Sequence, residues 1–281
     1  MWLALGPSRY EVTSRALVMG ILNRTPDSFY DRGRFFHLDA CCRRAEQLVA
    51  DGADVLDVGG FKAGPGPEVG EAEELERVVP AIEALHARFA VPLSCDTWRA
   101  SVARAAYAAG AVVGNEISGF ADPDYLAAAA EAGASVVATH IRMAPRVADP
   151  DPSYDDVVAD VAHFLAERAG RAEAAGIPPE RVMVDAGLDL GKTPDQSLRL
   201  LRESGHLAGL GYAVLLSASH KPFLGALLGL DVEDRHHASA AAHALGIVGG
   251  CRVLRAHDAR AARRVADVLA AVVASRPRKR W

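Results

Sequence analysis

The chain has 281 residues, 50% of them hydrophobic, and a formal net charge of -5 at pH 7. It carries neither a global positive charge nor a run of roughly 20 apolar residues, which argues against a nucleic-acid or membrane partner. We therefore expect a soluble cytoplasmic protein that binds a small molecule at a local site.

Eight short apolar runs alternate with segments of helical periodicity. The runs are 16–22, 55–60, 92–96, 112–118, 135–140, 182–185, 212–219 and 251–257. Segments such as 72–89 and 154–176 place apolar residues three and four positions apart, which predicts helices. The alternation predicts a single-domain (β/α)8 TIM barrel over residues 15–275, with a nine-stranded or open sheet as the alternative. We expect residues 1–14 to form a hairpin or cover beneath the barrel, and 276–281 to form a basic, solvated tail.

Polar side chains follow the carboxyl end of every predicted strand. They are Asn23, Asp27, Asp57, Asp96, Asn115, Glu116, His140, Asp185, His220, Lys221, Arg255 and His257. Any one of them could simply cap a helix or a turn. Because the carboxyl ends of barrel strands meet at one face, however, polar groups at all eight ends predict a functional site there.

These side chains fall into two chemical groups. Three are acceptors and amides that suit the N–H-rich edge of a flat heterocycle: Asp96, Asn115 and Asp185. Three are cationic or can become so, which suits an anion: Lys221, Arg255 and His257. Asn23 could hold a metal that bridges such an anion. The sequence shows no Ser-His-Asp or Cys-His arrangement, so it favours the positioning of a heterocycle and the departure of an oxyanion over a covalent protein nucleophile.

Seven motifs, in order along the chain, resemble those of the dihydropteroate synthase family. They are MGILNRTPDSF (19–29), DVGG (57–60), SCDT (94–97), GNEISG (114–119), DAGLDLGKT (185–193), SHKPFLG (219–225) and RAHD (255–258). The resemblance covers nearly the whole chain, and NxTPDSF is its most specific part. It implies a (β/α)8 barrel, usually a homodimer. It also implies a folate-pathway transferase that joins p-aminobenzoate to a dihydropterin, displaces pyrophosphate and requires Mg2+.

The resemblance also implies a role for each site residue. The residues that would hold the pterin are Asp96, Asn115, Asp185 and Lys221. The residues that would hold pyrophosphate are Asn23, Arg255, His257 and Lys62, and Asn23 would also contact the metal. Asp96 and Lys221 would be catalytic, with Asp96 stabilising the positive charge that builds on the ring as the pterin C–O bond breaks.

The second loop departs from the family pattern. Synthases generally read D-[IV]-G-G-E-S-T-R-P-G there, whereas positions 57–66 read DVGGFKAGPG. The residues that replace Glu, Ser, Thr and Arg are Phe61, Lys62, Ala63 and Gly64. A methyl group and a hydrogen cannot make the hydrogen bonds by which Thr and Arg help to assemble the aminobenzoate site, although Lys62 returns one positive charge. Pro222 replaces a family Ser and removes both a hydroxyl and a backbone N–H from the same side.

The pterin side is changed less. Asp189 and Leu190 stand where the family has Gly and Phe, and Glu116 stands where it has Asp. Because burying an unpaired carboxylate costs several kcal/mol, we expect Asp189 to point to solvent or to pair with Arg24 or Lys192.

Three functions fit these observations. The favoured one is a pterin-binding or regulatory paralogue with weak or no synthase activity, resembling the divergent second copies known in the family, because the losses concentrate on the aminobenzoate side. The alternative is an active transferase that uses 6-hydroxymethyl-dihydropterin pyrophosphate with p-aminobenzoate or another amine. The third is a relative of methyltetrahydrofolate-dependent methyltransferases, which NxTPDSF and the terminal RxHD disfavour.

Overall fold

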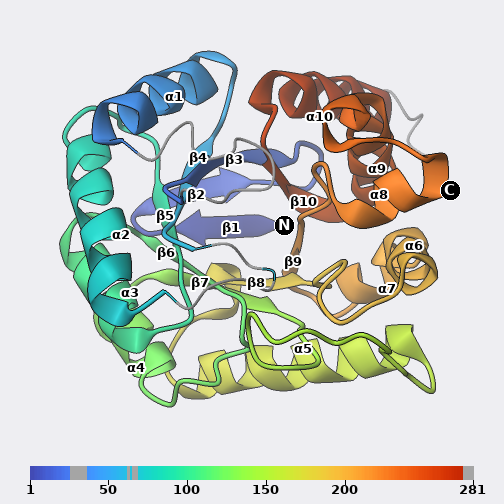
Figure 1. Ribbon diagram of the computed structural model, residues 1–281, viewed down its shortest axis with the longest axis horizontal. Helices are drawn as coiled ribbons and strands as arrows, with labels where there is room; N and C mark the ends of the chain where they lie inside the picture. The colour runs from blue at the N-terminus through green and yellow to red at the C-terminus, as the bar shows by residue number, and fades with distance from the viewer. Residues whose placement is uncertain (26–36, 62–63, 65–68, 275–281) are drawn as a thin grey trace, which may run out of the picture.

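The computed structural model describes residues 1–25, 37–61, 64 and 69–274. Eight parallel strands, β3 to β10, close into a barrel in the order β10-β3-β4-β5-β6-β7-β8-β9 (Figure 1). Their bounds are Leu17–Asn23, Val55–Gly59, Leu93–Asp96, Val113–Glu116, Ser135–Thr139, Val182–Asp185, Ala213–Leu216 and Cys251–Ala256. The prediction of a single-domain (β/α)8 barrel is confirmed.

Helices cover the outside of the barrel. The α-helices are α1 Leu38–Ala50, α2 Glu71–His86, α3 Ala100–Ala108, α4 Tyr125–Glu131, α5 Val157–Ala174, α6 Pro194–Arg202, α7 Ser204–Ala208, α8 Pro222–Leu228, α9 His236–Val248 and α10 Ala259–Ala274, and two 3-10 turns are η1 Pro179–Arg181 and η2 Val232–Asp234. The start of α5 is three residues later than the segment predicted from periodicity, because Asp156 caps the helix by accepting hydrogen bonds from the N–H groups of Val158 and Ala159.

The strands are apolar on both faces, since helices cover the outside and side chains fill the inside. All five residues of β4 are buried, including the charged Asp57. The outer faces of the strands and the inner faces of the helices form the main hydrophobic core. None of the helices in the described ranges is long and apolar enough to cross a bilayer.

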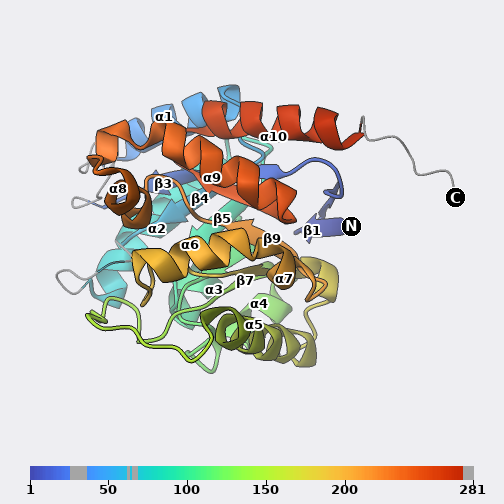
Figure 2. The same ribbon diagram turned by 90° about the vertical axis from the view of Figure 1, so that its right-hand side faces the viewer.

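An antiparallel hairpin, β1 Trp2–Leu5 and β2 Ser8–Glu11, closes the amino-terminal end of the barrel. Leu3 and Leu5 share a buried cluster with residues that begin the barrel strands, such as Leu17 and Val55. The Ser135 hydroxyl at the start of β7 donates a hydrogen bond of 2.7 Å to the Ala4 carbonyl. Figure 2 shows β1 at one end of the molecule and α8 toward the other. The hairpin thus covers the end of the barrel where the strands begin, and the cavity lies at the other end, where the strands finish.

Candidate functional site

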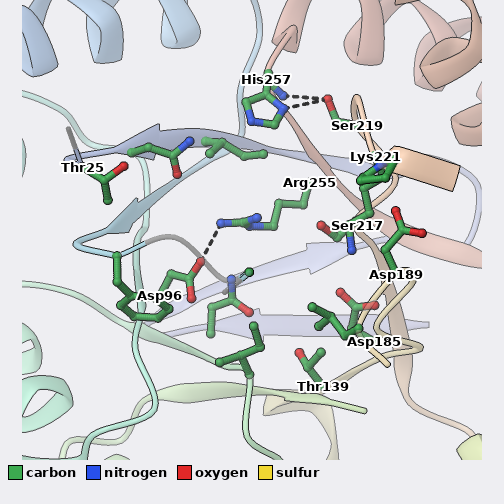
Figure 3. Close-up of a pocket in the computed structure, with 18 of the residues that line it drawn as sticks. Thr25, Asp96, Thr139, Asp185, Asp189, Ser217, Ser219, Lys221, Arg255 and His257 are labelled. Atoms are coloured by element: carbon green, nitrogen blue, oxygen red, sulfur yellow. Dashed lines mark hydrogen bonds and ion pairs between the residues drawn. The ribbon is translucent and has the colours of Figure 1, made fainter. Parts of the chain in front are cut away.

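A cavity of about 510 Å³ lies at the carboxyl ends of the strands. Seven of the predicted strand-end residues line it: Asn23, Asp96, Asn115, Asp185, Lys221, Arg255 and His257. Four others do not line it: Asp57, Glu116, His140 and His220. Figure 3 shows Arg255 reaching across the cavity toward Asp96, with Asp185 and Asp189 on the wall near Lys221. Two further predicted residues, Asp27 and Lys62, lie outside the described residues. The topology thus brings together these seven side chains from six of the eight strands or the segments that follow them.

A hydrogen-bonded network forms the floor of the cavity. The Arg255 guanidinium donates from Nε to Asp57 Oδ2 and from Nη2 to Asp96 Oδ2, at 2.7 Å in both cases. Asp57 also accepts a hydrogen bond of 2.6 Å from the Ser94 hydroxyl and one of 3.1 Å from the Asn115 amide. Arg255 and Asn115 are therefore held in fixed orientations by one fully buried carboxylate.

Burial changes the charge state of Asp96. It raises the pKa of the Asp96 carboxyl to about 7, against the opposing effect of Arg255 and with a further rise from Asp57. Burial thus favours the protonated form of this carboxyl, which can donate a hydrogen bond at the edge of a ring, whereas the ionised form can only accept one.

Asp185 and Lys221 form the other charged part of the wall. Burial raises the pKa of Asp185, and Lys221 opposes this effect. Burial also lowers the pKa of Lys221, whose ammonium group donates to the Leu188 carbonyl oxygen. Asp185 Oδ1 accepts the Gly187 N–H at 2.8 Å, which leaves acceptor capacity on the carboxyl for a ligand.

The loop between β8 and α6 is tied to the barrel by Lys192. Its ammonium group donates to the carbonyl oxygens of Gly187 at 2.9 Å and Leu190 at 3.0 Å, and lies 2.9 Å from His140 Nδ1. Burial lowers the pKa of Lys192 to about 7 and that of His140 to about 3. His140 is therefore a neutral hydrogen-bond partner of Lys192. Its side chain supports the β8–α6 loop and does not line the cavity.

His257 differs from the cationic group expected from the sequence. Burial, together with Arg255 and His220, lowers its pKa well below the ordinary value, so the imidazole is neutral. Its Nδ1 lies 3.1 Å from the Ser219 hydroxyl, which also accepts the His257 N–H at 3.1 Å. The sequence grouped His257 with side chains that are cationic or can become so, and desolvation disfavours the cationic form here.

Known proteins resemble this chain over nearly its whole length. Residues 19–257 match a family described as "Pterin binding enzyme". "Inactive dihydropteroate synthase 2" of Mycobacterium leprae is 44% identical over 94% of this chain and 92% of the relative, and the "Dihydropteroate synthase" of Bacillus subtilis is 38% identical over 95% and 92%. The chain belongs to the dihydropteroate synthase family. The family resemblance predicted from the sequence motifs is confirmed.

Solved structures of dihydropteroate synthases share the fold. The Yersinia pestis enzyme in complex with a sulfonamide drug has a TM-score of 0.94 and 34% identity, and covers 98% of this chain and 100% of its own. The Xanthomonas albilineans enzyme in complex with 7,8-dihydropteroate has a TM-score of 0.86 and 39% identity, and covers 98% and 99%.

Asp189, where the dihydropteroate synthase motif has Gly, lines the cavity. Its Oδ2 accepts the Phe223 N–H at the start of α8 at 3.2 Å, and its Oδ1 lies 3.5 Å from the Ser197 hydroxyl. The expectation that it points to solvent or pairs with Arg24 or Lys192 was therefore wrong, because backbone and hydroxyl donors satisfy the carboxylate instead. Burial raises its pKa, and Lys221 opposes that rise.

The cavity lining also includes Arg235, which was not singled out from the sequence. Arg235, just before α9, lines the wall and donates from its guanidinium to the carbonyl oxygens of Leu230 and His220 at 3.0 to 3.2 Å. Phe61 and Gly64 of the altered second loop also line the cavity, whereas Ala63 lies outside the described residues. Arg235 follows no strand and matches no motif used for the family comparison, so the sequence held no signal for it.

Proposed function

We propose that this chain is a pterin-binding member of the dihydropteroate synthase family with weak or no synthase activity. One observation carries the proposal: the four side chains assigned to the pterin, Asp96, Asn115, Asp185 and Lys221, line a single cavity. They supply two carboxyls, an amide and an ammonium group, which match the alternating donors and acceptors of a pterin ring.

The floor network supports this proposal because it limits the motion of the binding groups. Asp57 orients both Asn115 and Arg255 before any ligand arrives, so less conformational entropy is lost on binding. Asp96 would hydrogen-bond to the ring and, when ionised, would stabilise positive charge on it. Asp96 and Lys221 are accordingly the groups that we assign to catalysis if the chain turns over.

The anion half of the site would take a diphosphate. Arg255, the neutral imidazole of His257 and Asn23 line the same cavity, and Lys62 would add a charge from the second loop. Among the residues with described positions, no three His, Cys, Asp or Glu side chains lie together as a metal site. Mg2+ fits such a site only as a companion of the diphosphate, with Asn23 as a protein oxygen ligand, since Mg2+ usually takes few protein ligands and several phosphate oxygens. It would neutralise the charge of the diphosphate.

The part of the site that would bind p-aminobenzoate lacks several hydrogen-bonding groups of the family, which supports weak or absent turnover. Pro222 has neither the hydroxyl nor the N–H of the family Ser, and Gly64 lacks the guanidinium of the family Arg. An active transferase remains the second candidate. It is favoured by the 38% identity to the dihydropteroate synthase of Bacillus subtilis and by the match to the structures of other synthases.

The partner that we propose besides the small molecule is a second copy of the chain. Large apolar side chains are exposed on the adjacent helices α9 and α10: Leu245, Val248 and Val268 are between 46% and 61% exposed. An apolar surface of this kind is typical of a protein interface. Light scattering behind a sizing column would give twice the 29.7 kDa chain mass for the dimer.

Two measurements test the proposed function. Calorimetry with 6-hydroxymethylpterin should give saturable binding to the native protein, and Asp185→Asn should weaken it, because the ring N–H groups lose a charged acceptor. Release of pyrophosphate from the dihydropterin pyrophosphate should be slow or absent, with and without p-aminobenzoate. Absence of pterin binding would overturn the proposal, and turnover at 1 per second or faster would favour the active transferase.

A further inference from the structure

The cavity has an apolar wall next to the groups assigned to the pterin. Phe61, Val69 and Ile117 form a buried cluster, against which Trp98 and Leu190 pack. The Phe61 ring is 3% exposed and meets the Trp98 ring edge to face, with 4.2 Å between the ring centroids and 68° between the planes. Phe61, Ile117 and Leu190 all line the cavity. A carboxylate of the kind that the family carries at position 61 is thus replaced by a packed aromatic ring.

Charged neighbours behind this wall hold it in place. The Arg99 guanidinium lies over the Trp98 ring, 4.8 Å from its centroid, and donates a hydrogen bond of 2.8 Å to the Val69 carbonyl. Arg99 is itself ion-paired with the buried Glu74. Since these contacts hold both Trp98 and Val69, the apolar wall is a preorganised surface.

At the start of α8, the cavity lining offers an anion no free N–H from Pro222 or Phe223. Pro222 and Val232 line the cavity, and Pro222 has no N–H to offer. The next N–H of α8, that of Phe223, is already taken by the Asp189 carboxylate. A second carboxylate placed here would face Asp189 and would find its backbone donor occupied.

The described cations of the cavity are engaged by protein acceptors. Arg255 is paired with Asp57 and Asp96, and Lys221 donates to the Leu188 carbonyl. Arg235 uses Nε, Nη1 and Nη2 on two backbone carbonyls. A ligand carboxylate would therefore have to displace an existing contact, whereas an apolar group would bury against the wall without loss.

We propose that the subsite beside the pterin takes an uncharged aromatic or alkyl group, so that the ligand is a pterin with an apolar substituent in place of a benzoate. Phe61 and its contact with Trp98 determine this specificity, together with Leu190, Pro222 and Asp189. The inference rests on the proposed pterin binding and adds the chemical class of the substituent.

Three probes test the inference on the native protein by calorimetry. They are 6-hydroxymethylpterin, pteroic acid, and 6-anilinomethylpterin, which is pteroic acid without its carboxylate. We expect 6-anilinomethylpterin to bind at least tenfold more tightly than pteroic acid, because the carboxylate meets an apolar wall and Asp189. Equal or tighter binding of pteroic acid overturns the inference while leaving pterin binding intact. If 6-hydroxymethylpterin and both conjugates all fail to bind, the proposed function itself is overturned.

Substitutions test whether Phe61 determines the preference for 6-anilinomethylpterin over pteroic acid. Phe61→Leu keeps an apolar wall and should preserve the preference for 6-anilinomethylpterin. Phe61→Lys should reduce that preference at least fivefold, because an ammonium group beside the subsite attracts the benzoate carboxylate. Trp2→Lys is the matched control, since it makes an equivalent aromatic-to-cation change at an exposed position in the hairpin at the opposite end of the barrel. A preference that survives in a folded Phe61→Lys variant, or that is lost in Phe61→Leu or Trp2→Lys, excludes Phe61 as the determinant. Circular dichroism reports whether each variant is folded.

Discussion

Arg255 and Asp57 are 198 positions apart in the chain, yet the guanidinium Nε lies 2.7 Å from the carboxylate Oδ2 at the floor of the cavity. The pair joins β10 to β4 across β3, which lies between these two strands in the barrel. Asp57 is fully buried and accepts two further hydrogen bonds, so it holds several site residues at once. The site is therefore shaped by a carboxylate that does not itself line the cavity.

Asp57→Asn tests this relationship. In this variant, Asp96 would be the carboxylate that stays paired with the Arg255 guanidinium. The new amide would present either a donor or a weaker acceptor to Arg255 and Asn115, which now donate to Asp57 Oδ2. Because breaking a buried ion pair leaves an uncompensated charge, we expect the free energy of unfolding to fall by about 3 kcal/mol. Urea unfolding followed by circular dichroism measures this change. Glu131→Gln is the control, since it breaks an exposed ion pair with Arg104 and should cost less than about 1 kcal/mol. Equal losses in the two variants would contradict the role given to Asp57.

Gly187 is required by the path of the β8–α6 loop. Its φ is +63°, and a Cβ atom there would lie 1.9 Å from the His140 carbonyl oxygen. We expect Gly187→Ala to lower the free energy of unfolding by about 3 kcal/mol or more, since backbone strain and a clash with a fixed carbonyl add together. Thermal unfolding compares it with Gly176→Ala, which has a φ of +92° and open space around the Cβ position. That control should cost only about 1 kcal/mol, and a similar cost for both would rule out the clash.

Glu116 gives the stability of the protein a pH dependence. Burial raises the pKa of its carboxyl from 4.5 to about 7, even though the N–H groups of Ser118 and Phe120 donate to it. The folded state thus binds a proton more tightly than the unfolded chain, and the stabilisation present below pH 4.5 is lost as the pH rises to about 7. This shift corresponds to roughly 3 kcal/mol.

Glu116→Gln should remove the loss of stability that the native protein shows as the pH rises to about 7, because glutamine does not titrate. Urea unfolding between pH 4.5 and 7.5 would show a smaller fall in the free energy of unfolding for Glu116→Gln than for the native chain. Because Glu116 also raises the pKa of Asp96, both curves are measured in an Asp96→Asn background, where the difference between them reports Glu116. Parallel curves would mean that Glu116 titrates near its ordinary pKa.

The barrel and its ring of polar strand ends could be predicted because both follow from local patterns. An apolar run followed by a polar residue marks a strand end, and the barrel topology then brings those ends to one face. The contact between Arg255 and Asp57 had no such signal, since it depends on the register of strands that are distant in the sequence. Asp189 was misjudged for a related reason: its donors, the Phe223 N–H and the Ser197 hydroxyl, come from two other segments. Charge states such as that of His257 depend on burial, which a sequence pattern does not measure.

Restoring the family residues tests why turnover should be weak. The triple variant Ala63→Thr, Gly64→Arg and Pro222→Ser returns the hydrogen-bonding groups that the family uses for p-aminobenzoate. We expect release of pyrophosphate that depends on p-aminobenzoate to rise at least tenfold, because a serine at position 222 supplies a hydroxyl and an N–H for the carboxylate. Each additional factor of ten corresponds to about 1.4 kcal/mol of transition-state stabilisation.

A matched variant separates the position of the new arginine from its charge. Gly70 is exposed, and a Cβ atom there meets nothing within 4 Å, so Gly70→Arg in place of Gly64→Arg adds the same charge at a tolerant site nearby. Only the version with arginine at position 64 should gain activity. If neither version gains, the obstacle is Asp189, whose carboxylate lines the cavity and occupies the Phe223 N–H. Adding Asp189→Gly to the triple variant should then free that donor for the benzoate carboxylate and raise the rate of pyrophosphate release.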